Sequence, residues 1–366
     1  MTLKKILYYY NKMISWVPEK KINLNDVNKK IEECIEIKYL TNNGKNVIEL
    51  QKTIKNIFNI DEDKEVILTC NGAMGINALI GGLNIFYNKK LRWAVQSFTF
   101  PCSNQGLLID SIIFDLDDNM GPNIADLNKR KHEYDGILIT NCFGASTNIE
   151  LYETFCKDNN KLLLFDNAAA SFTYYNNKNH LNYGLGCMVS LHHTKPIGFC
   201  EGGFIVFDKK FLDVMEKSIC FGFTKYDKFN YDIYASNYKM SEISAIFISD
   251  FLKNLNVIYE HHTTIVNYFI KKFYDNNLNE HVRLFPNYSD YKNSLMSTIP
   301  LLFENEISTN VFFENSIEAK KYYYPLDLNC SFSSKLFKTI ICLPLNTDIT
   351  IEIIDLYIKI IKNLLK

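Results

Sequence analysis

Short apolar runs recur along the first two hundred residues, and each is followed by a polar or helical segment. Runs of this length that alternate with helices are typical of strands in a largely parallel sheet, buried on both faces. The pattern therefore predicts an α/β layered domain. The predicted strands cover residues 66–68, 93–95, 112–114, 136–139, 162–165, 189–191 and 203–207.

Helical spacing marks the segments between and beyond these runs. Residues 24–58 have this spacing, interrupted at 42–44, and residues 74–83 have the pattern of a buried helix. From about Met240 the pattern changes, and one long helix is predicted by four apolar residues at i, i+4 spacing: Ile243, Phe247, Phe251 and Leu255. We predict a large domain of residues 1–245, with an N-terminal helical segment, and a smaller C-terminal α+β domain of residues 246–366.

Composition narrows the class of protein. The 366 residues are 47% hydrophobic and 22% charged with a formal net charge of −1, which is typical of a soluble globular protein without a reason to bind nucleic acid. No apolar run reaches 18 residues, so no membrane span is expected. The ten cysteines are scattered without a Cys-x-x-Cys pair, and no apolar signal segment follows Met1. We expect free thiols and a cytoplasmic protein.

Candidate chemistry is expected where the strands end, because ligands of such sheets bind outside the carboxyl ends of the strands. Asp166 directly follows the run 162–165, and a buried carboxylate needs a cationic or hydrogen-bonding partner. Taken alone, Asp166 is better interpreted as the N-cap of a helix that starts near Ala168. No second carboxylate or histidine stands at ligand spacing, so no metal site is predicted.

Lys195 lies in an apolar neighbourhood after the run 189–191. Such a lysine can extend to solvent, or it can be desolvated so that its pKa falls and its amine can form a Schiff base. His192 and His193 precede it, and adjacent residues of an extended segment point to opposite sides. One packed and one exposed histidine is therefore favoured over zinc.

Two further stretches have weaker signals. Asn71-Gly72-Ala73 stands between a strand and a helix and is typical of an anion-binding helix N-terminus. Phe98 and Phe100 flank Thr99, and the default interpretation of alternating aromatics is a place in the core.

Together these signals supply the four groups that pyridoxal phosphate (PLP) needs: phosphate donors, a flat face, an acid for the ring nitrogen and a lysine. The chain resembles the DegT/DnrJ/EryC1/StrS family of PLP-dependent sugar aminotransferases. The most specific stretches are 190–195 with 201–203, 97–101, and 236–242. The resemblance implies an aspartate aminotransferase-like fold of type I, with a mixed, mostly parallel sheet in the large domain and a homodimer with shared active sites.

The resemblance also implies a role for each matched residue. Lys195 would bind PLP covalently and move the substrate proton, and Asp166 would pair with the pyridinium nitrogen. Phe100 would stack on the ring. The implied phosphate ligands are the Ser190 hydroxyl, the amides of Ala73 and Met74, and Asn237 of the neighbouring subunit.

Four positions depart from the family pattern. Gly72-Ala73-Met74 replaces the usual Gly-Thr-Ala, and no Gln or His follows Asp166-Asn167-Ala168-Ala169. Asn141 stands where His is common, and Lys239 stands where Arg is usual. One branch of the family has a histidine in place of the lysine and is a dehydratase. Lys195 argues against that branch, although the neighbouring histidines keep it open.

The implied activity is transamination of a nucleotide-linked ketosugar, with an amino acid such as glutamate as the donor, for glycan biosynthesis. One alternative is a PLP transaminase for a non-nucleotide keto-polyol or cyclitol. A second alternative is a regulatory protein that binds PLP without turnover.

Overall fold

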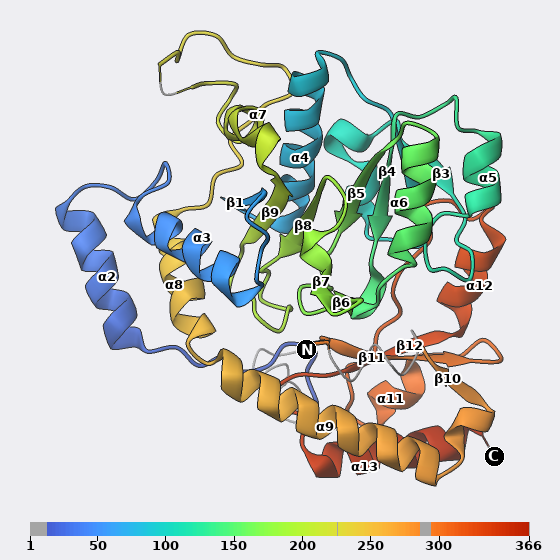
Figure 1. Cartoon of the computed structure of the whole chain (residues 1–366). Helices are drawn as coiled ribbons and strands as arrows, with labels where there is room; N and C mark the ends of the chain where they lie inside the picture. Colours follow the sequence, from blue (N-terminus) through green and yellow to red (C-terminus); the bar gives the residue numbers. More distant parts are fainter. Residues whose placement is uncertain (1–12, 225, 286–293, 366) are drawn as a thin grey trace, which may run out of the picture.

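A seven-stranded sheet forms the centre of the larger part of the molecule (Figure 1). The structure is a computed structural model, and it describes residues 13–224, 226–285 and 294–365. The strand order is β1-β9-β8-β5-β4-β2-β3, and only β9 runs antiparallel to its neighbours. The sheet is therefore mixed and mostly parallel, as predicted. Its strands are β1 (Lys64–Thr69), β2 (Trp93–Gln96), β3 (Ile112–Phe114), β4 (Gly136–Thr140), β5 (Leu162–Asp166), β8 (Gly186–Ser190) and β9 (Gly203–Asp208).

Helices cover both faces of this sheet. Ile137 and Ile139 of β4 join the core formed with α3, α6 and α8, whereas Leu138 between them joins the core formed with α4 and α7. Because both faces are buried, the strands are apolar without alternation. The helices of this part are α2 (Leu24–Glu36), α3 (Lys45–Ile57), α4 (Gly72–Tyr87), α5 (Ile124–Lys129), α6 (Ile149–Asp158), α7 (Leu212–Ser218) and α8 (Glu242–Leu252).

The prediction of one long helix after Met240 is wrong, because α8 ends at Leu252 and α9 begins at Leu255. Asn254 stands in the break. Its side-chain amide donates to the backbone oxygens of Phe251 and Lys21, at 3.3 and 3.2 Å. An asparagine that binds nearby backbone carbonyls competes with the helical hydrogen bonds, and this explains the break.

A three-stranded antiparallel sheet, β10-β11-β12, forms the second part of the molecule. Figure 1 shows it beside the large sheet, with α9 and α13 on its outer side. Its core includes Phe98 and Phe143, which come from loops after β2 and β4. The strands and helices of this part are α9 (Leu255–Asp275), β10 (Val282–Leu284), β11 (Thr298–Phe303), α11 (Asn310–Glu314), α12 (Ser331–Thr339), β12 (Ile340–Pro344) and α13 (Ile351–Leu364). Two further strands, β6 (Tyr174–Tyr175) and β7 (Lys178–Asn179), pair only with each other, and Tyr175 packs against the core of the large sheet.

The expected division into residues 1–245 and 246–366 stays a prediction, and α8 runs across that boundary. All ten cysteines are free, as expected. Among the described residues, no helix is both long and apolar enough to cross a bilayer.

A buried carboxylate joins α8 to the start of α3. Glu242 is 1% exposed. It accepts hydrogen bonds from the backbone N–H of Asn46 and of Val47, at 2.8 and 3.3 Å, and from the Asn46 side chain at 3.1 Å. Negative charge at a helix N-terminus satisfies N–H groups that lack intrahelical partners.

We expect Glu242→Ala to lower the free energy of unfolding by about 3 kcal/mol, because it leaves buried N–H groups of α3 without an acceptor. Urea titration monitored by circular dichroism measures this loss. Glu49→Ala, on the exposed side of the same helix, is the control and should change the free energy by less than about 0.5 kcal/mol. Equal losses in the two variants would contradict the capping role.

Candidate active site

The carboxyl ends of β1, β4, β5 and β8 lie at one edge of the large sheet, because these strands are mutually parallel. A cavity of about 390 Å³ opens at this edge, a size within the range of small-molecule sites. Thr140, Asp166 and Ser190, the last residues of three of these strands, contribute to its wall. Lys195 and Phe100 also line it.

Asp166 is buried at the end of β5, with 1% of its surface exposed. Its carboxylate accepts the Ala168 N–H at 3.0 Å and hydrogen bonds from Ser103 and Thr140. Thr99 braces both hydroxyls, at 3.1 Å from Ser103 Oγ and 2.6 Å from Thr140 Oγ1. Burial raises the pKa of Asp166, whereas the Ala168 amide, the charge of Lys195 and the two hydroxyls act to lower that pKa.

The interpretation of Asp166 as a helix cap is wrong. Residues 167–173 contain turns and no helix, and the bond from Ala168 closes a local turn. The carboxylate therefore has no helix to cap, and its side chain is directed to the cavity wall.

Lys195 lies on the turn that follows β8. Its N–H donates to the His192 oxygen at 2.8 Å, and its own oxygen accepts the Gly198 N–H at 3.1 Å. Burial lowers the pKa of the Lys195 amine, and the charge of Asp166 partly offsets this effect. Lys195 is half-buried and its side chain lines the cavity that contains Asp166. Of the two interpretations of this lysine, desolvation is therefore the one that its surroundings favour.

The N-terminus of α4 forms another wall of the cavity. Asn71 is its N-cap and accepts the Met74 N–H at 2.9 Å, so this amide already has a partner. Gly72 and Ala73 line the cavity, and Met74 does not. First-turn N–H groups lack intrahelical acceptors, and the helix dipole favours an anion there.

Glycines allow this helix end to approach the neighbouring strands closely. A Cβ atom on Gly72 would lie 2.9 Å from Met188 Sδ and 3.1 Å from Ser190 Cβ. A Cβ atom on Gly203 would lie 2.6 Å from the Asn71 carbonyl carbon. Side chains at either position would push the α4 N-terminus away from Ser190.

Phe98, Phe100 and Asn237 differ in their exposure to solvent and in whether they line the cavity. Phe98 is fully buried, as the core interpretation predicted, whereas Phe100 is 54% exposed at the cavity wall. Asn237 is exposed, lies outside the cavity wall and forms an isolated bridge with Cys220. The structure therefore brings together Ala73, Phe100, Asp166, Ser190 and Lys195, but not Met74 or Asn237.

The two histidines before Lys195 point to different partners. His192 contacts Thr194 Oγ1 at 2.9 Å and Glu201 Oε1 at 3.4 Å. His193 packs against the Phe199 ring, with 5.1 Å between ring centroids. Within the described residues, no cluster of three potential metal ligands occurs.

Asn141, which stands where the family often has histidine, belongs to a buried polar cluster. Its Nδ2 donates to Asn167 Oδ1 at 2.7 Å and lies 3.4 Å from Nδ1 of His180. Asn167 Nδ2 lies 3.3 Å from the same nitrogen. Burial lowers the pKa of His180 to about 3, so the imidazole is neutral at pH 7. No motif in the sequence pointed to His180.

An aromatic wall that the sequence did not predict closes the cavity from the side of the second part. Tyr323 stacks on Phe143, with 5.2 Å between ring centroids, and Tyr322 contacts Trp16 edge to face at 5.7 Å. All four rings line the cavity. They come from three distant segments, so only the folded chain brings them together.

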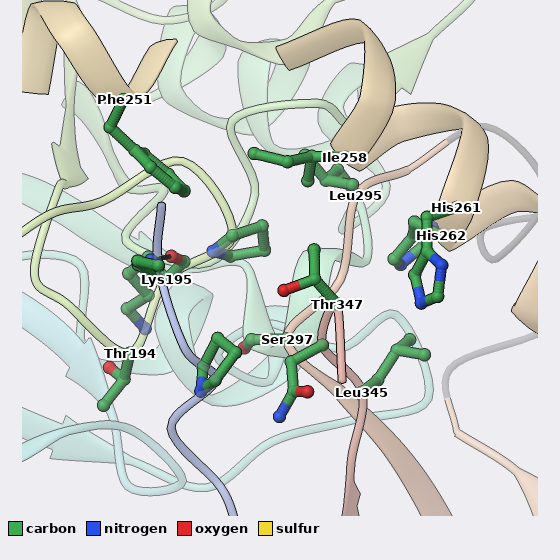
Figure 2. Close-up of a pocket in the computed structure, with 14 residues that line it drawn as sticks. Thr194, Lys195, Phe251, Ile258, His261, His262, Leu295, Ser297, Leu345 and Thr347 are labelled. Atoms are coloured by element: carbon green, nitrogen blue, oxygen red, sulfur yellow. Dashed lines mark hydrogen bonds between the residues drawn. The ribbon is translucent and has the colours of Figure 1, made fainter. Parts of the chain in front are cut away.

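A second, much smaller cavity of about 30 Å³ lies behind the turn of Lys195 (Figure 2). Figure 2 shows Thr194 and Lys195 on one side of it, and His261 and His262 on the other. This volume is sufficient for a single water molecule and not for a substrate.

Comparisons with known proteins agree with this arrangement. A sequence profile of the DegT/DnrJ/EryC1/StrS aminotransferase family matches residues 22–362. The dTDP-4-amino-4,6-dideoxy-D-glucose transaminase of Shigella dysenteriae is 23% identical over 251 residues, which cover 63% of this chain and 67% of that protein.

Solved structures share the fold. DesI in the presence of its TDP-sugar product has a TM-score of 0.82 and 15% identity, with 98% of this chain and 95% of that chain covered. A Streptococcus pneumoniae protein in its PLP form has a TM-score of 0.80 and 15% identity, with 96% and 98% covered. These likenesses confirm the predicted fold. Because the family profile spans nearly all of the sequence, the chain belongs to the DegT/DnrJ/EryC1/StrS aminotransferase family.

Proposed function

We propose that this aminotransferase uses PLP to convert a nucleotide-linked ketosugar to an aminosugar for glycan biosynthesis, with an amino acid, in the first instance glutamate, as donor. One observation carries the proposal. A buried carboxylate, Asp166, and a lysine whose pKa is lowered by burial, Lys195, line one cavity of small-molecule size. Perturbed groups of opposite charge in one cavity are typical of catalytic sites.

The groups that line the cavity fit the phosphate and the ring of PLP. An anionic phosphate suits the N-terminus of α4, where Gly72 and Ala73 contribute backbone N–H groups beside the Ser190 hydroxyl. The tight spacing around Gly72 and Gly203 keeps this end free of side chains, so a phosphate can approach the backbone. Phe100 presents an exposed aromatic face at the same wall.

When bound, PLP supplies an aldehyde that reacts with amines and a ring that withdraws electrons. Asp166 would hold a proton at the ring nitrogen, where its charge is paired rather than buried alone. Lys195 Nζ would retain the cofactor between turnovers. Because burial lowers the pKa of this amine, Lys195 would also accept and return the proton of the substrate carbon.

The aromatic wall supports a sugar substrate. The cavity that contains Asp166 and Lys195 also has flat apolar surfaces, and aromatic rings combine apolar area with polar edges. These surfaces come from Trp16, Phe143, Tyr322 and Tyr323. The nucleotide requirement is supported by the dTDP-sugar transaminase among the relatives.

We also propose a homodimer in which Asn237 reaches the phosphate site of the partner. Asn237 is exposed and outside its own cavity wall, so a role in the site requires a second chain. Residues 221–224 and 226–234 extend from the body beyond α7 (Figure 1). Their exposed side chains include Tyr226, Phe229, Tyr231 and Ile233, which are 91, 94, 75 and 76% exposed. Aromatic residues are enriched in interface cores.

The proposed substrate class is tested by turnover of a nucleotide-linked ketosugar, the same ketosugar without its nucleotide, and a keto-cyclitol, each with glutamate. Mass spectrometry of the amine product measures each reaction. We expect kcat/KM to be at least about 100-fold higher for the nucleotide-linked substrate, because the distant group contributes binding energy to the transition state. Equal rates for all three substrates, or a preference for the cyclitol, would contradict the nucleotide requirement.

Asp166→Asn should lower turnover far more than cofactor affinity. Loss of a charge-assisted contact costs about 1.5–3 kcal/mol, or about 10- to 100-fold in PLP affinity. We expect turnover at saturating PLP to fall by about 1,000-fold or more, because the transition state depends more strongly on this charge. Steady-state kinetics and PLP titration measure the two effects. The control is Asp208→Asn, which breaks the ion pair with Lys64 at the opposite edge of the sheet and should retain turnover. Near-wild-type turnover in Asp166→Asn would exclude a role of Asp166 at the ring nitrogen.

The shared site predicts complementation between two inactive variants. When equal amounts of the Lys195→Ala and Asn237→Ala variants exchange subunits, half of all dimers contain one chain of each, and each of these mixed dimers has one intact site. We therefore expect about one quarter of wild-type activity. A mixture of Lys195→Ala and Asp166→Asn is the control, because it rebuilds no site. If exchange is demonstrated by mass tags and activity stays at the sum of the parents, the shared site is wrong.

A further inference from the structure

Lys20 connects the N-terminal segment to the turn of Lys195. It lies before α2, more than a hundred residues from that turn in the chain. Its Nζ donates to the backbone oxygen of Lys195 at 2.6 Å and also to the backbone oxygen of Gly198. Lys20 itself has no assigned role in the reaction, and the sequence did not indicate these contacts.

The two acceptors are the ends of one tight turn. The Gly198 N–H donates to the Lys195 oxygen at 3.1 Å, so that oxygen accepts one bond within the turn and one from Lys20. A Cβ atom on Gly198 would lie 2.1 Å from the His192 oxygen and 2.4 Å from the Leu191 oxygen. The turn is therefore compact, and Lys20 binds the carbonyl at each end of it.

The surroundings of Lys20 hold its side chain in one place. Its Nζ lies 4.7 Å from the centroid of the Phe251 ring of α8, and it lines the small cavity of Figure 2. Burial lowers the pKa of Lys20 to about 7. An ammonium has three N–H groups and a neutral amine has two, so either form can donate to both carbonyls.

We propose that Lys20 is a positioning residue for Lys195: its two bonds to the turn fix the point from which the Lys195 side chain enters the large cavity. This inference rests on the proposed function of Lys195. Catalytic side chains must be held within a fraction of an ångström by their supporting contacts, and an unanchored turn would allow Lys195 to deviate.

Lys161 offers a matched control elsewhere in the fold. Its Nζ also donates to a backbone oxygen, that of Tyr134 at 2.6 Å, and lies 5.0 Å from the Tyr134 ring centroid. It precedes β5, at the edge of the sheet opposite the cavity. If Lys20 had only a structural role, replacing Lys20 and replacing Lys161 should have the same effect on the turn of Lys195.

The test compares Lys20→Met, Lys20→Arg and Lys161→Met. Hydrogen exchange of the cofactor-free proteins, followed by mass spectrometry of peptides spanning residues 191–200, reports the turn directly. We expect exchange there to rise by about tenfold in Lys20→Met, with partial restoration in Lys20→Arg, because arginine also donates two parallel N–H bonds. Lys161→Met should leave this peptide at the wild-type rate.

The second readout is the affinity for PLP and the visible absorbance band that PLP acquires when a lysine binds it covalently. We expect Lys20→Met to shift that band or its pH midpoint and to weaken PLP binding by about tenfold, and Lys161→Met to change neither. Wild-type exchange and a wild-type band in Lys20→Met would overturn the inference. So would equal changes in the two methionine variants. If Lys20→Met does not fold, Lys20→Gln, whose shorter side chain cannot reach both carbonyls, decides by the same two readouts. If wild-type protein shows no such band, the proposed function fails, whereas the exchange of residues 191–200 still reports on the Lys20 contacts.

Discussion

A carboxylate buried at the end of a central strand would destabilise the fold unless its surroundings satisfied it. Asp166 has these surroundings: the Ala168 amide, two hydroxyls braced by Thr99, and the charge of Lys195 from a neighbouring turn. Burial acts on the two groups in opposite directions, raising the pKa of the acid and lowering the pKa of the amine. Much of the local structure around the cavity positions side chains and backbone groups around Asp166 and Lys195. Examples are the compact turn 195–198 and the glycines beside the N-terminus of α4.

The large sheet could be predicted from the sequence because its strands are buried on both faces. The run 112–114 corresponds to β3, and the run 162–165 differs from β5 by one residue. The run 189–191 was displaced, since β8 covers Gly186–Ser190 and begins with residues that periodicity does not mark. The break at Asn254 was missed because it depends on side-chain bonds to Phe251 and Lys21, which spacing alone does not reveal.

The candidate site was predictable only in part. Strand ends identified Asp166 and Lys195 as candidates, and the family resemblance supplied their roles. The resemblance transferred a phosphate role to Met74, whose amide instead binds the N-cap Asn71, a contact that depends on the side chain at the preceding turn. His180 and the aromatic wall were missed because their partners are distant in sequence and come together only in the folded chain.

The Lys195 amine is the group that we propose PLP binds covalently. Incubation of the purified protein with PLP, reduction with borohydride and peptide mapping by mass spectrometry would locate the modified lysine. The burial of Lys195 beside Asp166 and the first turn of α4 predicts that the adduct lies on the peptide containing Lys195 and that Lys195→Ala abolishes it. An adduct confined to other lysines, or one of equal yield in Lys195→Ala, would contradict the account.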